Sequence, residues 1–354
     1  MQNKFFEIIY LLPELRFGGV QIFALDMAYH QITEGFKVKI FSVGKSYDVL
    51  ERYNIKKKSL LKDSIFLTNQ LSILIYIIKA VIIRRPIKIH TQGFLLTCVG
   101  FFSIFKNVNI IHTIQNEPIY EAGKIRSTLH SFFFNILNVK TVANSEIIGD
   151  KFDQYYGYKV NDVILNGVDI DNLQPLDQTN YVNVNDKGIN ILTVGSLGHH
   201  KNQKLLIDAF IQLNYENSYL YIIGKNYDNY LSDDFINDVK KNRVYILGER
   251  KDSFSFMDSC DIFCMSSRNE GLPLVLMEAK MKGMIAVVTD AGGSREILDE
   301  SDYLVTSHEI KDYKIALQKS ILAVNNNDYE RPSTKKTKFN IQRCHEDYLK
   351  ISFR

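Results

Sequence analysis

The sequence lacks the features that define several large classes of protein. Its four cysteines include no closely spaced pair and no histidine cluster accompanies them, so neither a disulfide framework nor a zinc site is indicated. The longest apolar run, residues 71–83, contains Lys79 and is shorter than the roughly 20 residues that cross a bilayer. The apolar start, residues 5–12, has no small-residue cleavage site after it. We therefore expect a cytoplasmic protein with reduced thiols and without a membrane span.

The composition is that of an ordinary globular protein. Of 354 residues, 45% are hydrophobic and 23% charged, and this length is sufficient for two domains. Residues 1–170 carry 20 lysines and arginines against 14 acidic residues, while the whole chain has a net charge of +3. Because these basic residues are dispersed and belong to no nucleic-acid-binding module, nucleic acid is not predicted as a partner.

Short apolar runs alternate with helical patterns along the whole chain. This order is typical of βαβ units and predicts an α/β fold with parallel sheets. Expected strands in the first half are EIIYLLP, VKIFSV, IKIHTQ, NIIHTIQ and VKTVANS, and in the second half INILTVG, YLYIIG, RVYILG, CDIFCMS and MIAVVTD. The helix at residues 20–33 is expected to end at Gly35.

A polar stretch without apolar periodicity, residues 166–188, separates the two series of strands. We predict a first Rossmann-like domain at 1–168, a linker at 169–188 and a second Rossmann-like domain at 189–338. Residues 339–354 are expected to form a helix that crosses back to the first domain. Two such doubly wound domains facing each other would bind ligands in a cleft, at the carboxyl ends of their strands. The DID sequence at 169–171 is interpreted as part of the hinge, and no metal site is predicted.

Two glycine-containing turns are suited to phosphate. Gly18 and Gly19 follow the first strand and open a helix, which leaves backbone N–H groups and a helix dipole directed at an anion. A bare GG pair is also compatible with a tight turn that binds nothing. In the second turn, Gly195 and a polar loop precede Lys201, whose charge suits a diphosphate leaving group. Lys201 is equally compatible with a solvated surface position, and His199 and His200 are expected to be exposed.

A third turn, SRNEGLPLVLMEAKMKG, carries Glu270, Pro273 and Glu278. Pro273 suits the first position of a helix, so the amides of Leu274 and Val275 are expected to be available to an anion. A carboxylate accepts two hydrogen bonds side by side and therefore suits the vicinal hydroxyls of a sugar. Separate roles, a glutamate favoured by a helix dipole and another on a solvated face, are the alternative. Together the three turns point to transfer of a sugar from a nucleotide diphosphate.

Seven segments of the chain resemble the retaining glycosyltransferases of family 4, which have the GT-B fold. These are GGVQ, NSEIIGDKF, ILNGVDIDNLQP, VGSLGHHKNQKLLIDAF, YLYIIG, VYILGER and NEGLPLVLMEAKMKGMIAVVTDAGGSREIL, in this order. The most specific feature is the spacing of Glu270 and Glu278 with GLP between them. The family is typical of bacterial polysaccharide and glycolipid assembly.

The resemblance implies a role for each matching residue. Lys201 would contact the diphosphate, Glu278 the ribose, and Glu270 with the amides of Gly271 and Leu272 the donor sugar. Gly18 and Gly19 would approach the donor from the first domain, and Glu249 and Arg250 would meet the base. Gly292, Gly293 and Glu296 match a motif that we interpret as mostly structural.

The sequence departs from the family at two places. Ser196 stands where many members have a phosphate-binding arginine, for which Arg250 or Arg268 could compensate. Gln92 and Gln115 stand where relatives often have histidine, and Gln115 lies beside the reacting sugar. Glutamine cannot act as a base, but it is compatible with front-face attack in which the leaving phosphate accepts the proton. His90 and His112 are the alternative groups, unless they are core residues.

These inferences predict a retaining hexosyltransferase. It would move a hexose or N-acetylhexosamine, expected to be UDP-linked, to a saccharide or lipid-linked acceptor, with Lys201, Glu270 and Gln115 as catalytic residues and no cofactor. A nucleotide-sugar 2-epimerase of the same fold is the main alternative. A hinged sugar-binding protein is disfavoured because no export signal is seen, and a nicotinamide-dependent oxidoreductase because GxGxxG is missing.

The basic first half suggests contact with an anionic membrane. The segment YNIKKKSLLK, residues 53–62, precedes the apolar residues 71–83, which end at Arg84 and Arg85. Basic residues are attracted to anionic lipid, and apolar side chains between them can insert shallowly. The expected location is thus the cytoplasm, peripherally on the inner face of the cell membrane. Alternatively, residues 71–83 form a core helix and only the lysine run meets the membrane.

Overall fold

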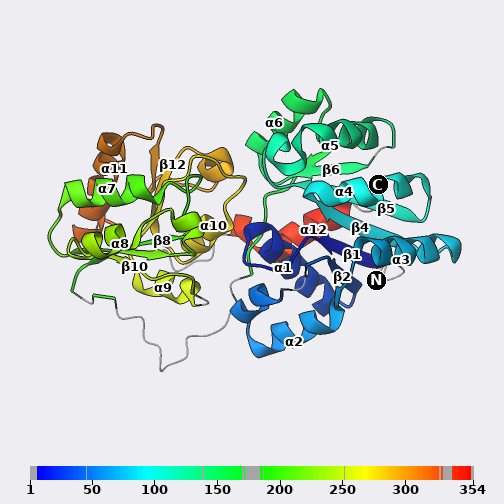
Figure 1. Cartoon of the computed structure of the whole chain (residues 1–354), viewed down its shortest axis with the longest axis horizontal. Coiled ribbons are helices and arrows are strands. Elements are labelled where there is room, and N and C mark those ends of the chain that lie inside the picture. Colours follow the sequence, from blue (N-terminus) through cyan, green and yellow to red (C-terminus); the bar gives the residue numbers. More distant parts are fainter. Residues whose placement is uncertain are drawn as a thin grey trace. The chain divides into compact units, whose positions relative to one another are not determined.

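The computed structural model describes residues 6–44, 46–137, 139–169, 171, 184–185, 187–250, 252–326, 328–329 and 337–351. The chain forms two compact units, one of Met1–Leu173 with Thr337–Arg354 and the other of Gln174–Lys336. Each unit contains one parallel sheet with helices around it (Figure 1). The α/β class predicted from the alternation of strands and helices is confirmed.

The first unit has a seven-stranded sheet in the order β3-β2-β1-β4-β5-β6-β7, with every neighbouring pair parallel. Its strands are β1 (Glu7–Leu12), β2 (Lys37–Ser42), β3 (Ile65–Leu67), β4 (Ile87–Gln92), β5 (Val108–Ile114), β6 (Lys140–Ala143) and β7 (Asp162–Val163). The five predicted strands are confirmed. The edge strands β3 and β7 were not predicted, because two or three residues are too few to show a period.

Helices cover both faces of this sheet. Ile9 and Leu11 face a core shared with α3 (Gln70–Ile82), α4 (Leu96–Val99), α5 (Pro118–Asn135) and α6 (Glu146–Tyr156). Tyr10, which points to the opposite face, donates to Gln31 of α1 (Gly19–Thr33) at 3.0 Å. Helix α1 contacts α2 (Ile55–Ser64) and α12 (Ile341–Ile351) on that face. It ends as predicted, since Gly35 adopts φ +84°.

The second unit has a six-stranded parallel sheet in the order β10-β9-β8-β11-β12-β13. Its strands are β8 (Ile189–Val194), β9 (Ser218–Ile223), β10 (Val244–Ile246), β11 (Ile262–Met265), β12 (Ile285–Thr289) and β13 (Tyr303–Val305). Its helices are α7 (Gln203–Leu213), α8 (Asp233–Lys240), α9 (Ser253–Ser259), α10 (Leu274–Met281) and α11 (Ile310–Asn325). All five predicted strands are present, and the three-residue β13 is additional.

The C-terminal segment lies against the end of the first unit's own chain. Val168 forms a parallel bridge with Asn340, and Arg343 donates from Nη2 to the carbonyl of Leu165 at 2.7 Å. A Cβ at Gly167 would lie 2.6 Å from Cα of Ile341, so only glycine permits this approach. Most of the predicted linker, 169–188, lies outside the described residues.

One lysine of the predicted membrane-binding run lies in the core of the first unit. The side chain of Lys57 is fully buried, with Nζ 2.7 Å from Asp26 and 2.8 Å from Asp169. The ring of Tyr53 lies 4.1 Å from the same nitrogen. The prediction that Lys57 contacts a membrane is therefore wrong, because α2 turns this lysine inward. Asp169 of the DID sequence serves to hold the chain leaving the first unit.

Three of the four cysteines are buried and Cys98 is half-buried, all with free thiols. None of the helices in the described part of the chain is long and apolar enough to cross a bilayer. The same residues contain no group of three or more histidine, cysteine, aspartate or glutamate side chains placed to hold a metal ion.

Candidate functional site

The predicted catalytic residues of the second unit meet at the carboxyl edge of its sheet. Lys201 lies in the loop after β8 and Glu270 in the loop after β11, and these two strands are neighbours. The Lys201 Nζ lies 2.5 Å from Oε1 of Glu270. The hydroxyl of Ser267 donates to the same carboxylate oxygen at 2.6 Å. The glutamate is almost buried and the lysine about one-third exposed, so this ion pair is accessible from one side.

The two loops are joined by further hydrogen bonds. The hydroxyl of Ser266 donates to the carbonyls of Lys201 and Asn202, at 3.1 and 3.0 Å. The amide of Arg268 donates to the carbonyl of His200 at 2.8 Å. These contacts fix the backbone on either side of Lys201 relative to the Glu270 loop. The ion pair is therefore held by the backbone as well as by its own charges.

The glycines of the motif interpreted as structural, Gly292 and Gly293, pack against the backbone of the Glu270 loop. Gly292, in the short helix η5 (Gly292–Glu296), has φ +54°, and a Cβ there would lie 1.9 Å from the carbonyl oxygen of Glu270. The amide of Gly293 donates to the carbonyl of Gly271 at 2.7 Å. A side chain at Gly292 would thus displace the loop that carries the glutamate.

Backbone amides after Glu270 remain available to a ligand. Pro273 is the N-cap of α10 rather than its first residue, which corrects the predicted position by one. Its carbonyl accepts from the amide of Leu276, at 3.1 Å. In the part of the chain that the structure describes, no acceptor is found for four nearby amides, those of Gly271, Leu272, Leu274 and Val275. Together they form an N–H cluster at the positive end of the helix.

Glu278 lies on the second turn of α10 and is buried, with 6% of its surface exposed. It is therefore fixed by the helix, whereas Glu270 is fixed by the loop that precedes it. The sequence predicted this difference, because it placed Glu270 in the turn and Glu278 in the helix that follows.

The remaining predicted donor-binding residues of the second unit differ in their surroundings. Glu249 is exposed, whereas the Arg250 guanidinium makes two hydrogen bonds to Asp252, at 2.8 and 2.7 Å. This hydrogen bonding holds the pKa of the Asp252 carboxyl below its usual value. Arg250 is thus engaged by a carboxylate and is a poor substitute for the missing phosphate-binding arginine.

The loop that contains Gly195 and Ser196 is held by Gln203. The Gln203 side chain donates to the carbonyl of Ser196 at 2.9 Å and accepts from the amide of Gly198 at 3.3 Å. Ser196 itself is exposed. Arg268 is also exposed, with Nη2 3.5 Å from Oδ1 of Asn202, and of the two arginines it is the freer to reach an anion.

In the first unit, the predicted glycines begin helix α1. Gly18 is the N-cap, and α1 starts at the exposed Gly19. No side chain caps this helix. A helix of this length carries a positive partial charge at its first turn, as the prediction of an anion-binding turn requires.

Gln115 belongs to a cluster of three buried amides. It follows β5, while Asn144 follows β6 and Asn166 lies beyond β7, so the three stand at the carboxyl ends of adjacent strands. The Gln115 Oε1 accepts from Nδ2 of Asn144 at 3.1 Å and from Nδ2 of Asn166 at 2.9 Å. The Gln115 Nε2 is buried without a hydrogen-bond partner in the described structure.

A backbone carbonyl fixes the orientation of these amides. Nδ2 of Asn144 also donates to the carbonyl of Gln115, at 3.2 Å, and a carbonyl can only accept. The Asn144 amide is therefore oriented, and it orients Gln115 in turn. The Nε2 of Gln115 is left as a neutral donor whose direction the network sets.

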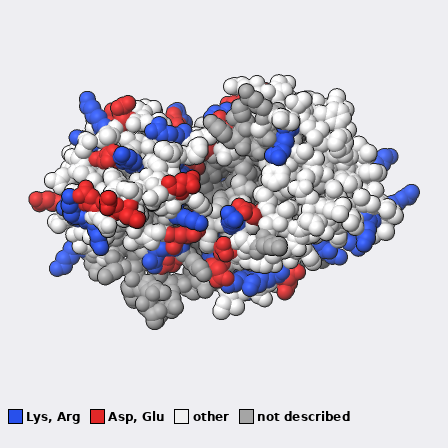
Figure 2. Space-filling model, viewed as in Figure 1, with Lys and Arg blue, Asp and Glu red and all other residues white. Residues whose placement is uncertain are grey.

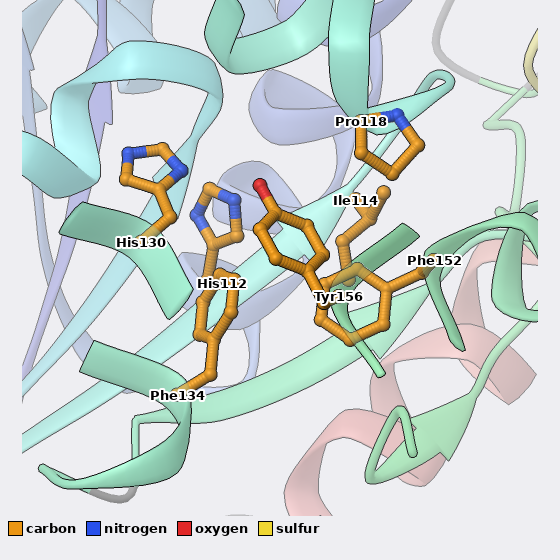
Figure 3. Close-up of a pocket in the computed structure, with 7 residues that line it drawn as sticks. All are labelled: His112, Ile114, Pro118, His130, Phe134, Phe152 and Tyr156. Carbon is orange, nitrogen blue, oxygen red and sulfur yellow. The ribbon is translucent and has the colours of Figure 1, made fainter. Parts of the chain in front are cut away.

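The two histidines considered as alternatives to Gln115 lie in the core. His90 stacks on Tyr10 with ring centroids 4.8 Å apart, and burial lowers the pKa of His90 to about 3. His112 bonds Thr91 through Nδ1 at 2.9 Å, and burial lowers its pKa well below 6.5. Figure 3 shows His112 beside His130, Phe134 and Tyr156, around a cavity of about 10 Å³, large enough for one water molecule.

A known family matches the part of the sequence that forms the second unit. Residues 177–338 match the family Glycosyl transferases group 1. That range contains the Lys201–Glu270 pair, the amide cluster and Glu278.

Three curated relatives are similar to parts of the chain. An uncharacterised glycosyltransferase of Methanocaldococcus jannaschii is 30% identical over 213 residues, covering 56% of this chain and 52% of the relative. An N-acetylgalactosaminyltransferase of Campylobacter jejuni, named for a diphospho-undecaprenol substrate, is 25% identical over 52% of each chain. The O-antigen biosynthesis glycosyltransferase WclY of Escherichia coli is 23% identical over 79% of this chain and 74% of its own. The chain spans about half the length of the first two.

A solved structure shares the fold over almost the whole chain. HepE of Anabaena in complex with UDP has a TM-score of 0.75 at 16% identity, covering 98% of this chain and 99% of that one. The two parallel-sheet, Rossmann-like units give this protein the GT-B fold, as predicted.

Several supporting residues were not predicted from sequence. Ser267 lies two residues after β11, but nothing in the neighbouring sequence distinguishes it from other serines. Asn144 and Asn166 stand in the quoted motifs NSEIIGDKF and ILNGVDIDNLQP, yet their contact with Gln115 depends on the order of β5, β6 and β7. The motifs located the segments in the sequence, whereas the strand order of the sheet determines which of their side chains are in contact.

Proposed function

We propose that this protein is a retaining glycosyltransferase. It transfers a hexose or N-acetylhexosamine from a UDP-linked donor to a saccharide or lipid-linked saccharide acceptor in the synthesis of a surface polysaccharide. The observation that carries the proposal is the Lys201–Glu270 ion pair beside four available amides at the start of α10. A cation, a carboxylate and oriented N–H groups are the groups that a nucleotide sugar needs at its phosphates and hydroxyls.

The leaving diphosphate is stabilised by Lys201 and by the amides that begin α10. Negative charge grows on the leaving oxygen as the glycosidic bond breaks, so oriented donors there lower the barrier most. Lys201 has three N–H donors, of which Glu270 occupies one. The remaining donors are directed to phosphate oxygens. Arg268, whose Nη2 lies 3.5 Å from Oδ1 of Asn202, adds positive charge next to the Lys201 loop.

The carboxylates bind the sugars of the donor. Glu270 accepts hydroxyl hydrogens of the transferred sugar through the oxygen that Lys201 and Ser267 leave free. Glu278, fixed on α10, accepts from the ribose hydroxyls. Glu249 and Arg250 lie in the loop expected to meet the base. Gly18 and Gly19 offer the uncapped start of α1 to the phosphates.

The amide of Gln115 is compatible with retention of configuration by front-face attack. An amide cannot remove a proton near neutral pH, so the departing phosphate accepts the proton of the acceptor hydroxyl on the same face of the sugar. The buried Nε2 of Gln115 donates to a substrate oxygen and orients it. Its orientation by Asn144 and Asn166 supports this role.

The comparisons support the choice of donor and acceptor. HepE was solved with UDP and with UDP-glucose. The names of the Campylobacter and E. coli relatives refer to a diphospho-undecaprenol-linked saccharide and to O-antigen biosynthesis. These relatives are transferases, and the 2-epimerase alternative gains no support from them. A lipid-linked acceptor would place the protein at the inner face of the cell membrane.

Nucleotide binding tests the proposal. We expect UDP and a UDP-sugar to raise the melting temperature of the protein and GDP not to, because only a ligand of the native state stabilises it. Glu278→Gln is expected to lose most of this shift, while Glu300→Gln, which changes an exposed glutamate of the same unit, is expected to keep it. Conversion of the free UDP-sugar to its 2-epimer without an acceptor would replace the proposal with the epimerase, and no shift with any nucleotide would overturn it.

A further inference from the structure

Helix α3 has apolar side chains on two faces. Ile73, Ile77 and Ala80, spaced i, i+4 and i+7, pack into the core of the first unit. The other face repeats the same spacing toward solvent: Leu71 is 65% exposed, Ile75 44%, Ile78 45% and Ile82 72%. A helix in a water-exposed layer normally has polar residues on its outer face. The outer stripe of α3 is therefore not explained by packing within this unit.

Segments linked to α3 add further exposed apolar side chains. The 3₁₀ helix η3 (Gly100–Ile104) contacts the end of α5, where the ring centroids of Phe101 and Phe132 are 6.1 Å apart. After η3, Asn107 donates from its side chain to the carbonyls of Ala80 and Arg85, which ties this segment to the end of α3. The outer surface comprises Leu71, Ile75, Ile78, Ile82, Ile83, Phe101, Ile104, Phe105, Phe132 and Ile136, all exposed.

The charge around this surface has one sign. No aspartate or glutamate occurs between Asp63 and Glu117. Lys79, Arg84 and Lys106 are exposed, and none of them forms an ion pair with a carboxylate in the described part of the chain. In Figure 2, the side over α3, at the right, is white with Lys and Arg along its edge, whereas acidic residues gather elsewhere on the face shown.

We propose that this outer surface docks on a bilayer that contains anionic lipid. Its cations lie beside the lipid headgroups while its isoleucines and phenylalanines insert into the interface. Exposed apolar patches rimmed by polar residues mark interaction sites, and a rim of one sign selects a partner of the opposite charge. A second copy of the chain would present like charge to this surface. The role of the docking, which is to bring the protein to a lipid-linked acceptor, rests on the proposed function, but the docking itself does not.

The chain contains no tryptophan, so one introduced tryptophan reports on a single position. Ile78→Trp on α3 is expected to shift its fluorescence to the blue when vesicles of phosphatidylcholine with about one third phosphatidylglycerol are added. The matched control, Ile315→Trp on α11 of the second unit, replaces an equally exposed isoleucine (41%) and is expected to keep its spectrum. A shift in both variants, or in neither, would overturn the proposal.

Sedimentation with the same vesicles separates this surface from the lysine run. Ile78→Glu combined with Ile82→Glu is expected to lower the fraction bound at least about tenfold, and Lys79→Gln with Lys106→Gln to lower it about as much at low salt. Lys56→Gln with Lys62→Gln, which removes two exposed charges of the lysine run, is expected to bind as the unmodified protein does. Loss of binding in the last variant alone would assign the membrane to the lysine run and overturn the proposal.

Two further measurements distinguish a direct effect on vesicle binding from an effect on folding or on the nucleotide site. All variants are compared by melting temperature and by the shift that UDP produces, since the docking surface contains none of the residues proposed to bind the nucleotide. Vesicle binding without any nucleotide shift would leave the docking in place and refute the proposed function. If the Ile78→Glu and Ile82→Glu variant instead changes the oligomeric state without lipid, the surface joins two copies of the chain and docking is refuted.

Discussion

At the scale of single residues, the charges and amides predicted to act on the substrate have partners that limit what they can do. Lys201 and Glu270 neutralise each other, so neither behaves as an isolated charge. Gln115 presents a donor because Asn144 and Asn166 both bond its oxygen. Neither Ser196 nor Arg250 supplies a free positive charge for phosphate, since Ser196 is uncharged and Arg250 is hydrogen-bonded to Asp252.

Removing the charge of Lys201 is expected to slow transfer more than it weakens binding. Lys201→Ala should lower kcat about 100-fold, because a donor aimed at the leaving group acts mainly in the transition state. Affinity for UDP should change much less. Steady-state kinetics with a UDP-sugar and calorimetry with UDP separate the two effects. Transfer at near the normal rate would remove Lys201 from the mechanism.

Replacing Gln115 by glutamate tests the direction of its amide. In Gln115→Glu one carboxylate oxygen still accepts from Asn144 and Asn166, while the other replaces the Nε2 donor. We expect transfer to fall at least about 100-fold near neutral pH, with the UDP-induced melting shift unchanged. Burial favours the protonated carboxyl, whose O–H donates again, so activity should rise as pH falls.

The pH profile of this variant distinguishes substrate contact from a structural role. A Gln115→Ala variant has no donor at any pH and should stay slow throughout. Equal activity of Gln115→Glu and the unmodified protein across the pH range would show that Nε2 touches no reacting group.

At the scale of elements, loops of one strand are held in place by the loops of its neighbours. Gly292 and Gly293 support the Glu270 loop, and Ser266 joins it to the loop after β8. In the first unit, Lys57 binds Asp26 of α1 and Asp169 beyond β7 in one buried cluster. Breaking such a buried ion cluster from one side typically costs about 3–5 kcal/mol.

Two glycines of the second unit allow the support of the Glu270 loop to be measured. Gly292 and Gly248 both have left-handed φ angles, +54° and +71°, but a Cβ at Gly248 meets nothing within 4 Å. Gly248→Ala is expected to cost about 1 kcal/mol of unfolding free energy from backbone strain alone. Gly292→Ala should cost more and lower UDP affinity at least about tenfold, because its Cβ displaces the carbonyl of Glu270.

Urea denaturation and calorimetry with UDP measure both quantities. If the two alanine variants lose the same stability and bind UDP equally, η5 does not position the Glu270 loop.

At the scale of the whole molecule, the two units differ in their buried titratable groups. Burial lowers the pKa of His90 to about 3 and of His130 and His345 to about 4, and that of His112 well below 6.5. All four belong to the first unit. Each is neutral in the native state, where its pKa is depressed, and takes up a proton more readily when the chain unfolds.

The first unit is therefore expected to lose stability in mild acid. Above about pH 6.5 these histidines are neutral in both states and have no effect; as pH falls toward 4, each costs about 1.4 kcal/mol of unfolding free energy per pH unit. Urea denaturation between pH 7.5 and 5 measures the slope. His90→Phe keeps a ring against Tyr10 but does not titrate, so it should flatten the slope, whereas the exposed His200→Phe should not. Identical slopes in all three proteins would contradict this origin.

The sequence by itself determined the fold class, the strands and the segments that carry the site. Periods of two and 3.6 residues are local, so they located the central strands of both sheets and also the edge strand β10, which lies in the apolar run RVYILG. The strands β3, β7 and β13 were missed because two or three residues are too few to show a period. Glu270 and Glu278 were found because a turn, a proline and a helix lie within a short stretch of chain. These features depend on neighbours in sequence.

Only the tertiary structure decided which of these residues meet. Lys57 reads as one of three surface lysines until α2 is placed against α1, and then it is the buried member of an ion cluster. Asn144 and Asn166 orient Gln115 only because β5, β6 and β7 are adjacent in the sheet. Both apolar stripes of α3 are compatible with core positions in the sequence, and only the packing of one stripe against the sheet shows that the other is exposed. Contacts between distant segments depend on strand order and helix rotation, which local periodicity does not specify.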